Sequence, residues 1–224
     1  MTTRHLHVDK LGPLLLVVAT LLPACRHADA PPPEAAPLPP PMSERIRGLP
    51  SLPYPLAQAS PAFQRLFEGV DVALEDRIPL PDARDEAAYR AYVDGPLSAW
   101  LGRRAEALEE AEARLGSIRT EGMTPEAVVG DTLVAYLYES TARDVIANDV
   151  PAGNPARAGA IRDAWRTSMR PMLDRARTYF LHCVEATRTP PIELSAWAAV
   201  CRDHAASTLP GGEAPTTPSA QDRP

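Results

Sequence analysis

The sequence predicts an all-α domain of antiparallel helical hairpins or a helical bundle, which follows a disordered, proline-rich tether. Apolar residues recur at helical spacing over nearly all of residues 60–208, and no alternating strand bounded by turn residues occurs there. Ser-Pro, Thr-Pro and Asn-Pro pairs mark helix starts, and the connections between helices are short. Eleven prolines stand within residues 31–61, where they prevent a helix or an interior strand.

The first helix is predicted to begin at Ser60-Pro61. Ser60 suits the N-cap and Pro61 the first helical position, where the missing N–H costs nothing. The apolar residues that follow lie on one side of the helix: Phe63, Leu66, Phe67 and Val70. Prolines at 79 and 81 end the segment that follows this helix in the chain.

Residues 85–118 predict a second helical region that breaks or kinks near residue 95. Tyr89, Tyr92 and Val93 precede the pair Gly95-Pro96, which interrupts the helical hydrogen bonds. Beyond this pair, helical spacing continues in these apolar residues: Trp100, Ala107, Leu108, Ala111, Leu115 and Ile118.

Charged residues of both signs alternate with those apolar residues: Arg103, Arg104, Glu106, Glu109, Glu110, Glu112 and Arg114. Glu106/Glu110 and Glu110/Arg114 stand four residues apart, as neighbours on one helix face do. Mixed sign at this spacing is typical of a solvated helix face. We therefore expect this charged run to face solvent and to have no functional role.

Two further helices are predicted to begin at Thr124-Pro125 and at Asn154-Pro155. The helix from Thr124 ends near Asn148 and carries on one face Val129, Leu133, Tyr136, Leu137 and Ser140.

The helix from Asn154 contains Pro171, which should kink or divide it. Its apolar residues are Ile161, Trp165, Met169, Met172, Leu173, Ala176, Phe180 and Val184. Pro190-Pro191 closes it, and a last helix from near Ser195 presents Leu194, Trp197 and Cys201. From about residue 209 the chain lacks apolar periodicity, so residues 209–224 are predicted to form a disordered tail.

The chain begins with a polar stretch and a twelve-residue apolar run from Leu11 to Leu22, too short to span a bilayer and suited to a secretory signal. Leu22-Pro23-Ala24-Cys25 resembles the lipobox of bacterial lipoproteins, although Pro23 departs from the usual small or hydroxyl residue. The resemblance implies that residues 1–24 are removed and that Cys25 carries acyl chains. The alternative is an ordinary secretory signal beside an incidental cysteine. Arg26, where an Asp would resemble an inner-membrane retention signal, favours the outer membrane.

Residues 25–59 are predicted to be the tether, which would hold residues 60–208 away from the lipid surface. There are two alternatives. The segment is a disordered leader whose length is not under selection, or it is a proline-rich ligand for a partner domain. Removing residues 1–24 changes the formal charge from −6 to −7, because they contain Arg4, Lys10 and Asp9. An acidic chain argues against binding to nucleic acid.

Ala176, Phe180 and Cys183, followed by Pro190, resemble the second helix of a tetratricopeptide repeat. The segment from about residue 124 to 206 is also similar to helical, tetratricopeptide-like C-terminal regions of bacterial envelope proteins. A preceding repeat pattern and a 34-residue period are missing, so an ordinary helical bundle remains an alternative. The resemblance implies protein–protein binding on a concave helical surface, without catalysis.

With Cys25 lipidated, Cys183 and Cys201 are the remaining cysteines, and an oxidising envelope favours a disulfide between them. The alternative with a more specific function is a metal site formed by His182, Cys183, Cys201 and His204. Adjacent residues 182 and 183 diverge by about 100° around a helix, which disfavours a tetrahedral set. We expect no bound metal or cofactor.

Trp100, Trp165 and Trp197 are interpreted as packing residues, with sugar-stacking platforms as the alternative. No nucleophile elbow, zincin, phosphate-loop or dinucleotide motif is present, so we expect no catalytic residues and no enzyme. The sequence therefore predicts an outer-membrane lipoprotein, facing the periplasm or the exterior, that presents a non-catalytic helical domain to an envelope protein partner. The alternative is an envelope enzyme or cell-wall-binding protein with the same anchor.

Overall fold

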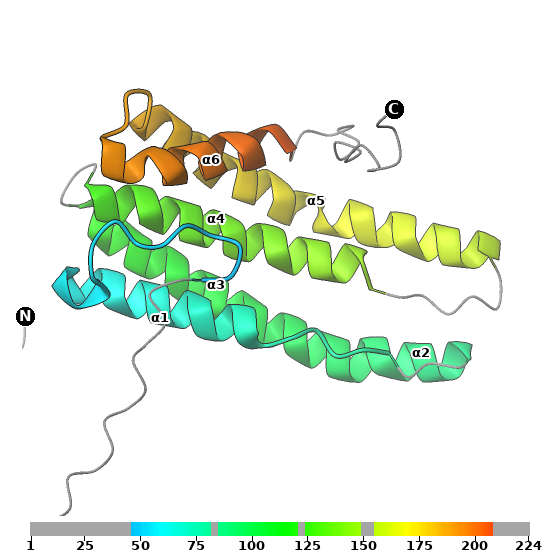
Figure 1. The fold of residues 1–224 in the computed structure, drawn as a ribbon. Coiled ribbons are helices and arrows are strands. Elements are labelled where there is room, and N and C mark those ends of the chain that lie inside the picture. Colours follow the sequence, from blue (N-terminus) through cyan, green and yellow to red (C-terminus); the bar gives the residue numbers. More distant parts are fainter. Residues whose placement is uncertain (1–45, 82–84, 121–123, 149–154, 208–224) are drawn as a thin grey trace, which may run out of the picture. The chain divides into compact units, whose positions relative to one another are not determined.

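A computed structural model describes residues 46–81, 85–120, 124–148 and 155–207, and these residues contain helices and no strand (Figure 1). The all-α prediction is confirmed. The signal segment 1–24, Cys25, the tether up to residue 45 and the tail 209–224 lie outside the described residues.

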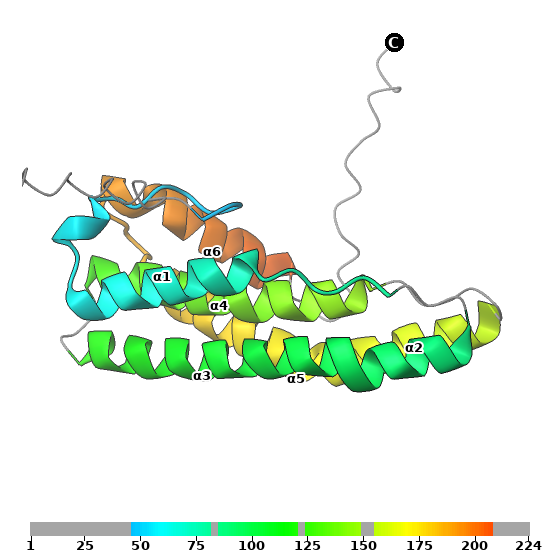
Figure 2. The ribbon, with the colours of Figure 1, turned by 90° about the horizontal axis from the view of Figure 1, so that it is seen from below.

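Helix α4 occupies the centre of the bundle, packed against α1, α3, α5 and α6 (Figures 1 and 2). In chain order the elements are η1 (Leu56–Gln58), α1 (Pro61–Glu75), α2 (Glu86–Tyr92), η2 (Val93–Leu97), α3 (Ser98–Arg119), α4 (Pro125–Ile146), α5 (Pro155–Ala186), η3 (Ile192–Leu194) and α6 (Ser195–Ser207). Because helices surround α4, its first half is buried on all sides, whereas a surface helix would keep a polar face.

The predicted helix starts of α1 and α4 are confirmed by their caps. The Ser60 hydroxyl accepts a hydrogen bond from the Phe63 N–H at 3.2 Å, and Thr124 caps α4 in the same way. Glu126 in the first turn of α4 also accepts a 2.8 Å hydrogen bond from the Ser60 N–H. The starts of α1 and α4 are therefore tied to each other, although 66 residues separate Ser60 from Glu126.

The predicted break at Gly95-Pro96 is a single π-helical turn, η2, which joins α2 to α3. The wider turn accommodates a proline that lacks the N–H of a regular helix. Pro171 does not divide α5, which is helical from Pro155 to Ala186.

Two clusters of buried side chains form the core. The larger follows α1, α3, α4, α5 and α6, and its fully buried aromatic members are Phe63, Phe67, Phe180 and Trp197. The smaller lies where α2, the start of α3, the end of α4 and the middle of α5 meet, and it contains Tyr89, Tyr92, Trp100, Val145 and Met169. Full burial of Trp100 and Trp197 confirms them as packing residues, and Trp165 is half-buried, with its Nε1–H donating to the Tyr89 hydroxyl at 3.1 Å.

The boundary between tether and domain lies earlier in the chain than residue 59. The segment 46–59 packs on the bundle, where Ile46, Leu49 and Leu56 are buried. The Trp197 Nε1–H donates to the Ser51 carbonyl at 3.1 Å and holds this segment in place. Its prolines do prevent a regular helix or strand, but an extended segment can still bury apolar side chains against helices from elsewhere in the chain.

Two glycines are required by close packing. Gly48 has φ of 91°, and a Cβ there would lie 2.5 Å from the Tyr136 hydroxyl. Gly130 lets α4 approach its neighbours, because an added Cβ would lie 2.9 Å from a methyl of Leu115 and 3.2 Å from one of Leu66.

Candidate functional site

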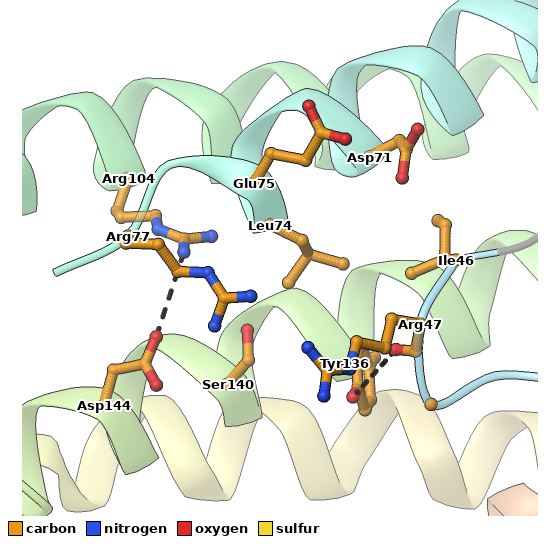
Figure 3. A pocket seen from close by; sticks show the side chains of 11 residues that line it. Ile46, Arg47, Asp71, Leu74, Glu75, Arg77, Arg104, Tyr136, Ser140 and Asp144 are labelled. Carbon is orange, nitrogen blue, oxygen red and sulfur yellow. Dashed lines mark hydrogen bonds and ion pairs between the residues drawn. The ribbon is translucent and has the colours of Figure 1, made fainter. Parts of the chain in front are cut away.

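Two neighbouring hollows share one wall residue, Arg104 of α3. The first, which we name the charged cleft, has a volume of about 560 Å³ and lies between segment 46–48, α1, α3 and α4 (Figure 3). It is lined by Ile46, Arg47, Gly48, Asp71, Leu74, Glu75, Arg77, Arg104, Tyr136, Ser140 and Asp144.

The second hollow, which we name the apolar groove, has a volume of about 370 Å³ and lies between α3, α4 and α5. It is lined by Leu101, Arg104, Ala105, Leu108, Glu109, Tyr138, Thr141 and Met172. Leu108 is buried, whereas Ala105 and Glu109 are exposed, so the groove has a covered floor and an open rim.

Arg104 corrects the prediction of a fully solvated charged face on this helix, because only 2% of its side chain is exposed. Its Nη2–H donates to the Asp76 carbonyl at 3.0 Å, and its guanidinium lies 4.9 Å from the Trp100 ring centre. Asp76 is the C-cap of α1, and its carbonyl at that helix end accepts hydrogen bonds from both Arg104 and the Trp100 Nε1–H, the latter at 2.9 Å. Arg104 therefore ties α1 to α3.

Arg104 retains hydrogen-bonding capacity beyond this structural role. Its Nε and Nη1 have no hydrogen-bond partner among the described residues, and its nearest carboxylate oxygen, on Asp144, is 3.9 Å away. Burial lowers the pKa of the Arg104 guanidinium, while Asp144 and Asp76 act in the opposite direction. Arginine nevertheless stays protonated in proteins, so the wall of the cleft carries a partly unpaired positive charge.

Acidic groups enter the charged cleft from two helices. Asp71 and Glu75 lie one turn apart on α1, beside the apolar residues that this helix buries. Asp144 comes from α4. Burial raises the pKa of Asp71, and the neighbouring Glu75 raises it further. Burial also raises the pKa of Asp144, whereas Arg104 and Arg77 lower it.

Four charged side chains in this cleft make no ion pair within the part of the chain that the structure describes: Arg47, Asp71, Glu75 and Arg77. The cleft hydroxyls are both used as donors to backbone, Tyr136 to the Arg47 carbonyl at 3.3 Å and Ser140 to Leu137 at 3.1 Å. Burial raises the pKa of the Tyr136 phenol, which is protonated at neutral pH even at its ordinary value. This arrangement is suited to binding charged groups.

Cys183 and Cys201, which the sequence predicts to pair, form a disulfide with a Cα–Cα distance of 6.1 Å. The bond joins α5 to α6 inside the larger core cluster, and both cysteines are fully buried. The Thr132 hydroxyl of α4 lies 3.0 Å from the Cys201 sulfur.

The alternative metal site finds no support in this geometry. The two cysteines bond to each other, His182 Nδ1 lies 3.0 Å from Arg119 Nη2, and His204 Nδ1 pairs with Glu139. The described residues contain no group of three or more His, Cys, Asp or Glu side chains placed to hold a metal ion.

The sequence interpretation also missed two buried carboxylates of α4. Asp131 and Glu139 are 0% and 1% exposed and pair with Arg119 and with His204, respectively. Arg143 adds a 2.7 Å ion pair to Glu139. For Asp131 a signal was available, because the start of α4 is almost continuously apolar, and an acid within such a stretch is buried with it.

Glu112 is a further departure from the predicted solvated face. It is half-buried and accepts hydrogen bonds from Tyr179 at 2.7 Å, Arg175 at 2.9 Å and Tyr138 at 3.1 Å. Burial raises the pKa of Glu112, but these hydrogen bonds together lower it below its usual value. The residue links α3, α4 and α5 by accepting from all three donors.

Comparisons of the chain with protein-family models, with curated proteins and with solved structures find no match. Among the described helices, none combines the length and the apolar character needed to cross a membrane.

Proposed function

We propose that this chain is a lipid-anchored protein of the bacterial outer membrane whose helical domain binds an envelope protein without catalysis. The observation that carries the proposal is the apolar groove, whose half-buried Leu101 and Met172 line an opening between three helices. A partner side chain of leucine size would gain about 1.5–3 kcal/mol by leaving water there, and methionine adapts to varied shapes.

The anchor part of the proposal rests on the lipobox-like Leu22–Cys25. A disulfide between Cys183 and Cys201 agrees with an oxidising compartment outside the cytoplasm. Because Ile46 already packs on the bundle, at most residues 26–45 are left to separate Cys25 from the domain, and a fully extended chain of that length reaches about 60 Å. That length still separates the domain from the lipid surface.

Tetratricopeptide-like character of α4–α6 is part of the same proposal. Ala176, Phe180 and Cys183, on which the resemblance rests, all lie in the core, as small and aromatic packing positions of a repeat would. Their burial supports a packing role for these residues.

Site-specific photo-crosslinking in intact cells tests the binding proposal. A photo-reactive amino acid at Ala105, on the rim of the groove, should yield one adduct of defined mass with an envelope protein. Ala113 is the matched control, because it is also an exposed alanine of α3 but does not line the groove. No adduct from Ala105, or the same adducts from both positions, would contradict the proposal.

Intact-mass spectrometry of the membrane fraction tests the anchor separately. The expected mass is that of a chain beginning at Cys25 with two or three acyl chains, and Cys25→Ala should abolish it. An unlipidated mature chain would refute the anchor without affecting the crosslinking result.

The alternative of an envelope enzyme or a cell-wall-binding protein draws on the charged cleft, where titratable side chains converge. An adduct with cell-wall material from a photo-reactive residue at Glu75, which is exposed and lines this cleft, would favour this alternative.

A further inference from the structure

The charged cleft contains a buried cation whose hydrogen bonds are incomplete. Arg104 is 2% exposed, and its Nε and Nη1 lack partners among the described residues. Figure 3 shows its guanidinium directed into the cleft, beside that of Arg77. A buried guanidinium with unused donors is costly, and an anion that enters the adjacent space would reduce that cost.

The same end of the cleft has more positive than negative charge. Arg77 and Arg104 both act on Asp144, the carboxylate that lines this end of the cleft. The Asp76 carboxylate also acts on Arg104, but it is already paired with Arg103. Guanidinium groups bind carboxylates through paired, charge-assisted hydrogen bonds. A second carboxylate, supplied by a ligand, would complete this cluster.

Farther back along α1 the imbalance is reversed. Asp71 and Glu75 face the cleft from successive turns of α1, and neither forms an ion pair with a described residue (Figure 3). Burial raises the pKa of Asp71, and repulsion by the neighbouring Glu75 carboxylate raises it further. An ammonium group between them would relieve this repulsion.

Size and net charge narrow the class of ligand. Ligand sites for small molecules occupy about 300–1,000 Å³, and this cleft has about 560 Å³. Its three arginines balance its three acids, so a ligand whose own charges cancel is favoured over a strong anion or cation. Ile46 and Leu74 provide apolar surface along the same cleft.

We propose that the charged cleft binds a small zwitterion, a free α-amino acid or a dipeptide, with its carboxylate at Arg77 and Arg104 and its ammonium at Asp71 and Glu75. This inference goes beyond the proposed function, because it concerns a different hollow and a small molecule in place of a protein. The binding of a partner to the apolar groove can fail while zwitterion binding stands, and the reverse also holds.

Isothermal titration calorimetry of the detergent-solubilised, oxidised mature chain tests the inference. The probes are the free α-amino acids and the dipeptide Ala-Ala, compared with succinate, putrescine and inorganic phosphate. At least one zwitterion should bind, and Arg77→Gln and Glu75→Gln should each weaken its binding at least about tenfold, since each removes a charge-assisted contact. Arg77 and Glu75 are both exposed, so the two variants should fold as the wild type does.

Arg114→Gln and Glu110→Gln are the matched controls, because these residues pair with each other on α3 outside the cleft. They should leave binding unchanged. Equal or tighter binding of succinate or phosphate, lost in Arg77→Gln and kept in Glu75→Gln, would show a plain anion site and overturn the inference. The absence of heat with every zwitterion at millimolar concentration would overturn it as well.

Discussion

Replacing Asp131 by Asn removes a carboxylate that is 0% exposed in the centre of the bundle. Arg119 pairs with its Oδ1, while Oδ2 has no hydrogen-bond partner among the described residues. Burial raises the pKa of Asp131 to about 6, although Arg119 acts in the opposite direction. The folded protein therefore holds a proton on Asp131 more tightly than the unfolded chain does.

This difference sets the sign and the size of a pH effect. An unfolded aspartate titrates near pH 3.9, so from about pH 4 to pH 6 the folded state binds more protons at Asp131 than the unfolded state. The contribution of Asp131 to the free energy of unfolding is most favourable below about pH 4 and falls as the pH rises through 6. The pKa changes by about two units, and each unit corresponds to about 1.36 kcal/mol. Over the full titration, the contribution of Asp131 to the free energy of unfolding therefore falls by about 3 kcal/mol.

Urea unfolding followed by circular dichroism, at several values from about pH 4 to pH 7, measures the effect. The free energy of unfolding of Asp131→Asn, minus that of the wild type, should grow by about 2 kcal/mol across this range, because about half of the unfolded-state titration already lies below pH 4. His182 titrates in both proteins, so its lowered pKa largely cancels in the difference. Asp163→Asn, at an exposed aspartate of α5, should give a nearly constant difference.

A constant difference for Asp131→Asn as well would refute the argument. It would mean that solvent or Arg119 keeps this carboxylate charged in the folded protein at no net cost.

Three further results are expected in urea unfolding. Gly130→Ala should lower the free energy of unfolding by roughly 1 kcal/mol, since crowding in the core outweighs the gain in helix propensity. Replacing Cys183 and Cys201 together by Ala should cost about 3 kcal/mol, because the bond closes a loop with a sequence separation of 18. A chain that begins at residue 60 should be markedly less stable than one that begins at residue 42, because it loses the buried side chains of segment 46–59.

Each of these results has its own control. Gly69→Ala has open space around the added methyl and should raise stability by about 0.5–1 kcal/mol, so a loss equal to that of Gly130→Ala would contradict the packing argument. Reductant should lower the stability of the wild type and leave the double cysteine variant unchanged. Equal midpoints for the two truncated chains would mean that segment 46–59 does not support the bundle.

The sequence predicted those features that depend on a few neighbouring residues. The caps at Ser60 and Thr124 are local, because a cap acts on an N–H only two or three residues away. The pairing of the two cysteines could also be predicted from the sequence, since a short connection between two helices brings Cys183 and Cys201 near each other.

Arg104 shows where a local argument fails. It stands four residues after Trp100 and four before Leu108, within the apolar stripe of its helix, but its charge suggested a solvent-facing position. Its burial depends on the Asp76 carbonyl at the end of α1, which sequence spacing on α3 does not reveal. The periodicity was the better guide in this case.

The sequence by itself determined that the domain is helical, where most helices begin, and which cysteines can pair, because periodicity, capping and hairpin geometry act over short stretches of chain. Only the tertiary structure decided that segment 46–59 belongs to the domain, that Asp131 and Glu139 are buried, and that arginines and acids converge on one cleft. The physical reason is that burial and electrostatic pairing depend on neighbours distant in sequence, and the packing of α1, α3 and α4 determines which neighbours those are.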